Sequence, residues 1–167
     1  MVTTAPVAAE IGHTPEKSKS GLSDAGAAAR NALARATKEP KEFKRWTAPR
    51  HGISLSTASR DVGEFTRVLV VAVRNTNREA VRVLPGHPEM FVETSGGDNR
   101  PVLIEWVRKL HTETTTLSNV VPAGAVVYYA LGYESPILGA KQHLRVAVGH
   151  RNAADEPASS DLTTADR

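Results

Sequence analysis

The stretch EFTRVLVVAVRN, from Glu64 to Asn75, decides the fold of this chain. Its apolar core, Val68 to Val73, is unbroken, rich in valine and bounded by arginine on both sides. The run is too short for an ordinary helix, and β-branched side chains favour extended backbone. Apolar residues at consecutive positions of a strand point to both faces. The run therefore predicts a strand in the middle of a sheet, covered on both sides.

A second segment of this kind is AVVYYALGY, Ala125 to Tyr133, which follows a Pro122-Ala-Gly124 corner and predicts a second central strand. Other segments are apolar on one face only, as in the last one, where Leu144, Val146 and Val148 alternate with polar residues. These shorter strands are predicted at His51–Ala58, Ala80–Leu84, Glu89–Thr94, Val102–His111, Thr112–Val121 and Lys141–His150.

Turn residues separate the predicted strands. Leu84-Pro85-Gly86 predicts a type II turn that stops a strand, and Thr94 to Pro101 predicts a plain loop. After that loop, apolar residues occupy the even positions of a strand that buries Trp106; these are Val102, Ile104, Trp106 and Leu110.

Seven to eight short strands in about a hundred residues, with turns at intervals of roughly a dozen, are typical of an immunoglobulin-like two-sheet β-sandwich. We expect the two doubly apolar segments to be the central strands of the facing sheets, with Trp106 between them. The chain resembles the broad class of bacterial immunoglobulin-like modules in having an aliphatic strand ending near Asn75, then the Pro122 to Gly124 corner, then the aromatic strand with Tyr128 and Tyr129. Such a superfold implies no particular function.

The sequence predicts three parts: a basic arm over residues 1–50, the sandwich over 51–151 and a disordered tail over 152–167. Residues 23–38 are rich in alanine and predict a helix that ends before Pro40, with Leu33 as its only large apolar side chain. The arm carries nine Lys/Arg against five Asp/Glu, and residues 51–150 carry ten against nine. Because the sandwich is nearly neutral, nucleic acid is not the expected partner.

The chain has no cysteine, which excludes disulfides and thiolate chemistry. No apolar run approaches the length of a membrane span, and no secretory signal is visible. The expected compartment is periplasmic or extracellular if a signal peptide has been removed, and otherwise cytoplasmic or within a virion.

Four aromatic residues are the candidate partner contacts: Phe43, Trp46, Tyr128 and Tyr129. Phe43 and Trp46 lie among basic residues, which leaves two interpretations: they contact a partner, or they fasten the arm to the edge of the sandwich. Adjacent tyrosines on a strand face opposite sides, so one enters the core and the other contacts either a partner or the arm.

Motifs for catalysis or metal binding are weak. His111 and Glu113 lie on one side of an extended chain, but a third ligand from His143, His150 or Glu105 cannot be assigned from sequence. The Gly96-Gly97-Asp98-Asn99 segment lacks the acidic positions of a calcium loop. No nucleophile elbow, Walker motif or dinucleotide loop occurs, so we expect no enzyme, no cofactor and no metal.

The sequence therefore predicts a non-enzymatic structural or protein–protein interaction module, a component of a larger assembly such as a cell-envelope or secretion apparatus or a particle shell. Its partners would be other protein subunits, with self-association through the N-terminal arm as one mode. The alternative is a glycan- or peptide-binding sandwich that uses exposed aromatic rings. A nucleic-acid binder acting through the basic arm and a small hydrolase are further hypotheses.

Overall fold

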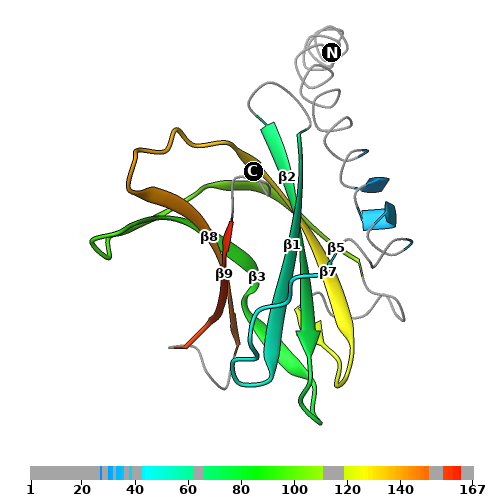
Figure 1. The fold of residues 1–167 in the computed structure, drawn as a ribbon. Coiled ribbons are helices and arrows are strands. Elements are labelled where there is room, and N and C mark those ends of the chain that lie inside the picture. Colours follow the sequence, from blue (N-terminus) through cyan, green and yellow to red (C-terminus); the bar gives the residue numbers. More distant parts are fainter. Residues whose placement is uncertain are drawn as a thin grey trace, which may run out of the picture.

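The computed structural model describes residues 43–61, 66–110, 119–150 and 156–162, together with positions 27, 30, 31, 33–35 and 38. The described residues between 27 and 38 are helical, and nearly all the rest is antiparallel β-structure in two sheets (Figure 1). No described helix is long and apolar enough to cross a membrane.

The first sheet, here the β2 sheet, has the order β1-β2-β7-β5. Its strands are β1 (Ile53–Asp61), β2 (Thr66–Asn75), β7 (Val126–Glu134) and β5 (Ile104–Leu110). The second sheet, here the β3 sheet, has the order β4-β3-β8-β9, with the short β6 also paired to β3. Its strands are β3 (Val81–Thr94), β4 (Asn99–Pro101), β6 (Val120–Val121), β8 (Gln142–His150) and β9 (Ala158–Leu162).

These orders match those of an immunoglobulin sandwich, with β1, β2, β7 and β5 as strands A, B, E and D and β3, β8 and β9 as strands C, F and G. The predicted fold class is confirmed. The core between the sheets is built from the inward side chains of both. It contains Ile53, Leu55, Leu69, Val71, Val73, Val81, Val83, Met90, Val92, Val121, Val127, Tyr129, Leu131, Tyr133, Leu144, Val146, Val148, Ala158 and Leu162.

The two doubly apolar strands do not face each other, which corrects the predicted arrangement. β2 and β7 are neighbours in one sheet, with Val70 opposite Ala130 in register. The β2 sheet is covered on its inner side by the β3 sheet. On its outer side a second group of side chains, here the outer cluster, covers it. This cluster contains Leu33, Phe43, Ala58, Val68, Val70, Ala72, Tyr128 and Ala130, with Trp46, Trp106 and Val126 packed against it.

The arm supplies this second cover, so both central strands are apolar on both faces while belonging to one sheet. The same contact explains why β1 is not half-exposed as predicted. Ser54 and Ser56 point outward from the core, yet their exposed fractions are 0% and 2%.

Trp106 lies in the outer cluster and not between the sheets, because β5 contains a bulge. Ile104 pairs with Tyr133 and Trp106 pairs with Gly132, so β5 has one more residue than β7 at this point. An extra residue reverses which side of the sheet the following side chains face. A Cβ at Gly132 would lie 2.0 Å from Trp106 Cε2, so the glycine makes room for the indole.

Three local predictions were also wrong. Residues 81–94 form the single strand β3, which passes through a cis Leu84–Pro85 bond and an irregularity between Leu84 and Glu89 instead of stopping there. The expected loop before residue 101 contains β4. The expected tail contains β9, whose Ala158 and Leu162 are each only 2% exposed. Of the predicted strand at 112–121, residues 112–118 lie outside the described residues.

Candidate functional site

The structure places all four candidate aromatic residues in contacts within the chain. Phe43 is 4% exposed, and its ring centroid lies 5.4 Å from that of Tyr128, which is 9% exposed. The Arg74 guanidinium lies 4.2 Å from the centroid of the Trp46 ring, a cation–π contact. These residues fasten the arm to the outer face of the β2 sheet, and Trp46 stays partly exposed there.

Tyr129 points the other way, into the core between the sheets, where it is fully buried. Burial raises the pKa of its hydroxyl well above the ordinary value. The Lys109 ammonium lies 5.8 Å from the centroid of the Tyr129 ring and donates to the carbonyl oxygen of Val120 at 2.8 Å. Partial burial lowers the pKa of Lys109.

The residues considered for metal binding are not brought together. His111 and Glu113 lie outside the described residues, and His143 lies 3.3 Å from Asp161 at the β8–β9 edge. His150 lies at the other end of β8. Among the described residues, no group of three His, Asp or Glu side chains could hold a metal ion. The segment Gly96 to Asn99 is a hairpin connection, closed by a hydrogen bond from Thr94 N to the Asp98 oxygen.

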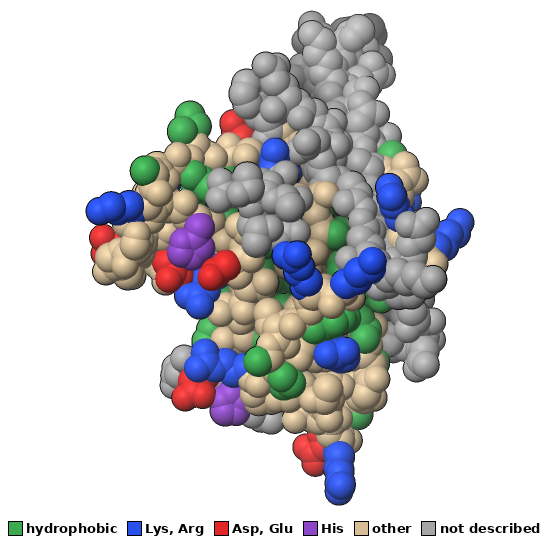
Figure 2. Space-filling view, in the orientation of Figure 1, with side chains coloured by type: hydrophobic (Ala, Val, Ile, Leu, Met, Phe, Trp, Pro, Cys, Tyr) green, Lys and Arg blue, Asp and Glu red, His purple; other side chains and the backbone are tan. Residues whose placement is uncertain are grey.

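Among the residues that the structure describes, the most exposed large hydrophobic side chains lie at the end of the sandwich formed by the β4–β5 and β7–β8 connections. Leu103 is 80% exposed and Ile137 is 96% exposed. They border an open groove of about 370 Å³, here the Leu103 groove. Its lining residues are Val92, Arg100, Pro101, Val102, Leu103, Glu105, Glu134, Ser135, Pro136 and Ile137. Hydrophobic side chains project from this end in the space-filling view (Figure 2).

The fold positions this groove through backbone constraints. Val102 N donates to the Met90 oxygen at 2.9 Å, which ties the β4–β5 connection to β3. Pro101 and Pro136 restrict the backbone on the two sides of the groove. Arg100, Glu105 and Glu134 are the charged residues of its lining, so the rim carries one excess negative charge. The lining therefore combines apolar and charged side chains.

Sequence reasoning missed Leu103 and Ile137. Leu103 occupies an odd position of a strand whose even positions the sequence predicts as the buried face, and Ile137 lies in a predicted loop. The available signal was the aliphatic pair Ile137-Leu138 between Pro136 and Gly139, in a loop where polar residues are usual.

No protein family matches the chain, and no curated protein matches it in sequence. Solved structures that are similar include the archaellum periplasmic stator protein complex FlaF and FlaG from Sulfolobus acidocaldarius, at 14% identity and a TM-score of 0.40, covering 69% of this chain and 91% of that chain. The stator protein FlaG from the same organism has 16% identity and a TM-score of 0.36, covering 64% and 98%. The GAE domain of yeast GGA1 has 7% identity and a TM-score of 0.39, covering 72% and 99%.

Proposed function

We propose that this chain is a non-enzymatic structural or protein–protein interaction module, one component of a larger assembly such as a cell-envelope or secretion apparatus or a particle shell. The observation that carries the proposal is the Leu103 groove with its two exposed aliphatic side chains. Burying a leucine or isoleucine side chain is favourable by about 1.5–3 kcal/mol. Leu103 and Ile137 are both left in water beside the groove, so burying them against a partner would contribute favourably to the free energy of binding.

The partner that fits is another protein subunit. An aliphatic or aromatic side chain fills the groove between Leu103 and Ile137, and a neighbouring lysine or arginine of the partner pairs with Glu105 or Glu134. Desolvated apolar contacts at the centre give affinity, and the charged rim selects the partner and its orientation. A glycan-binding module needs accessible rings, yet Phe43, Tyr128 and Tyr129 are buried, and the partly exposed Trp46 already stacks with Arg74.

The proposal is tested by placing a photo-reactive amino acid in the full-length chain, one position at a time, in cells of the source organism. We expect positions 103 and 137 to form an adduct with the same single protein, identified by mass spectrometry. The matched control is position 84, because Leu84 is also an exposed aliphatic residue, at 36%, but does not line the groove.

Reversing the charge of Glu105 and Glu134 gives a second part of the experiment. The double variant Glu105→Lys and Glu134→Lys should reduce the adduct yield at position 103 at least tenfold, since it places like charges against the basic partner. Equal adducts from all three positions, or none from 103 and 137, would show that the groove is not a docking site.

A further inference from the structure

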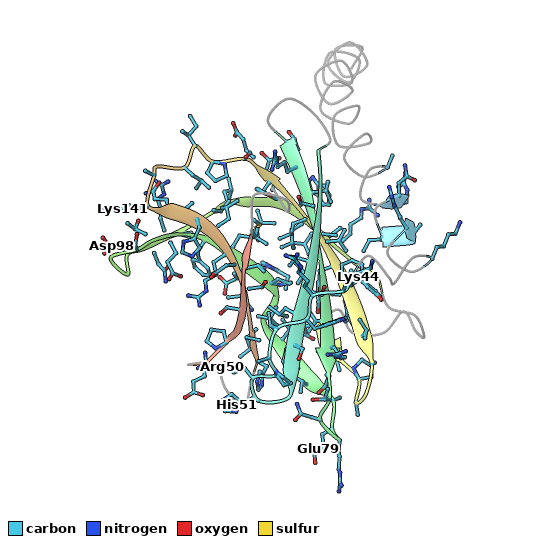
Figure 3. The ribbon with its side chains drawn as sticks, viewed as in Figure 1. Lys44, Arg50, His51, Glu79, Asp98 and Lys141 are labelled. Carbon is cyan, nitrogen blue, oxygen red and sulfur yellow. The ribbon has the colours of Figure 1, made fainter. Side chains whose placement is uncertain are left out.

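A second pocket of about 400 Å³ lies at the end of the sandwich where β1 begins and β8 ends. Its lining residues are His51, Asn77, Arg78, Glu79, Ala80, Val81 and His150. Figure 3 shows His51 beside Arg50 at this end, and Asp98 and Lys141 far from it. None of the residues that line this second pocket lines the Leu103 groove.

His150 is the unusual group in this pocket. Its side chain is only 3% exposed, and neither Nδ1 nor Nε2 has a hydrogen-bond partner among the described residues. A buried polar group without a hydrogen-bond partner is unfavourable, so a ligand that binds the ring would stabilise it. In its neutral form the imidazole of His150 keeps one ring nitrogen with a lone pair that can bind a metal ion.

His51 presents a second imidazole to the first. The two ring centroids lie 6.0 Å apart, with an angle of 65° between the ring planes. Imidazole nitrogens bind Zn²⁺ at about 2.0–2.1 Å, which places the centroids of two rings on one ion roughly 5–6 Å apart. The observed separation is therefore close to that of two histidines sharing an ion.

Glu156 and the local backbone hold His51 in place. The Glu156 Oε2 atom lies 2.6 Å from His51 Nε2, which leaves Nδ1 as the free ring nitrogen. A carboxylate on the outer nitrogen is the usual support of a metal-bound histidine. His51 and Gly52 have positive φ values of 49° and 78°, and Asn77 Nδ2 donates to the His51 oxygen at 2.9 Å. This fixed turn holds the ring beside His150.

We infer that His51 and His150 form a binding site for a divalent transition-metal ion such as Zn²⁺, with Glu156 as the residue that positions His51. Two imidazole nitrogens are its protein ligands. This site has fewer than three protein ligands, so it is expected to bind Zn²⁺ more weakly than a structural zinc centre, which has four.

The test is a titration of the full-length chain with ZnCl₂ by isothermal calorimetry at pH 7.5, after removal of metal with a chelator. We expect one ion per chain with a Kd on the order of 1–100 µM. His150→Asn and His51→Asn should each weaken binding at least tenfold. Asparagine suits position 51 because it readily adopts positive φ, so this variant reports on binding even if the variant at 150 does not fold.

Two further variants separate ligands from other effects. His143→Asn is the matched control, since His143 is also partly exposed and paired with an acidic residue but lies away from the pocket. It should leave the Kd unchanged. Glu156→Gln should weaken binding about tenfold and alter the shift of the His51 ring nitrogens in NMR spectra on adding Zn²⁺.

The inference is overturned if wild type and His51→Asn bind Zn²⁺ equally, if His143→Asn loses as much affinity as His51→Asn, or if Zn²⁺ leaves the ring signals of both histidines unmoved. If this metal-binding inference fails, the proposed docking at the Leu103 groove is not affected.

Discussion

Asn75 shows how much one polar residue contributes at the end of a central strand. It is fully buried, and its Nδ2 donates to the Glu79 oxygen at 2.9 Å and to the Val121 oxygen at 3.1 Å. Its Oδ1 accepts from Asn77 N at 2.9 Å. These bonds join the end of β2 to β6 and to the turn that leads into β3. The side chain thereby links the two sheets at one end of the sandwich.

Replacing Asn75 with alanine should lower the free energy of unfolding by about 2–4 kcal/mol, because buried backbone groups lose their partners. Denaturant unfolding of the full-length chain measures the change. Asn99→Ala is the control, since Asn99 is exposed in β4, and it should change stability by less than about 0.5 kcal/mol. Equal losses in the two variants would contradict the role assigned to Asn75.

The arm is the element that completes the β2 sheet. A turn at His51-Gly52 reverses the chain, and Thr47 bonds the free edge of β1 twice: its N donates to the Leu55 oxygen and its Oγ1 accepts from Leu55 N, both at 2.9 Å. The arm thus occupies part of an edge that would otherwise be open to pairing with another chain. Phe43 and Leu33 continue the contact over the outer face.

Truncating Phe43 to alanine should destabilise the protein by about 3–5 kcal/mol, the cost of removing a buried phenyl ring. It should also uncover the outer cluster, so light scattering should show stronger concentration-dependent self-association than for the wild type. Phe91→Ala is the comparison, because Phe91 is only partly buried and lies in β3. If Phe43→Ala is as stable and as monomeric as wild type, the arm does not stabilise the sheet.

The whole molecule has different chemistry at its two ends. One end carries the exposed aliphatic side chains of the Leu103 groove, and the other carries the paired imidazoles of His51 and His150. The C-terminal strand β9 pairs with β8 and touches β1, so it closes one side of the sandwich between these ends.

Closure by β9 depends on Leu162, which is 2% exposed and pairs with Leu144 in register. Leu162→Ala should reduce the free energy of unfolding by about 2–5 kcal/mol. Ser159→Ala, on the same strand but partly exposed, should leave it nearly unchanged. Thermal and denaturant unfolding compare the two variants. Equal stability of both would mean that β9 adds nothing to the core.

The sequence by itself determined the fold class and the central strands. Strands β2 and β7 have apolar or aromatic residues at consecutive positions, such as the valines of β2 and the Tyr128–Tyr129 pair of β7. Both faces of these strands must therefore be covered, and this can be recognised from the local sequence pattern alone. Of the candidate site, sequence reasoning found none of the groove residues, because solvent exposure of Leu103 or Ile137 depends on which loops meet at one end.

Only the tertiary structure decided which segments cover the two faces of the β2 sheet and which strands pair. Strand pairing is a contact between distant parts of the chain, so no local pattern shows that β2 and β7 share a sheet or that a polar segment supplies β9. One extra residue in β5 moved Trp106 from the inner to the outer face. Side-chain alternation sets the two faces of a strand, but the packing of the whole chain decides which face meets the core.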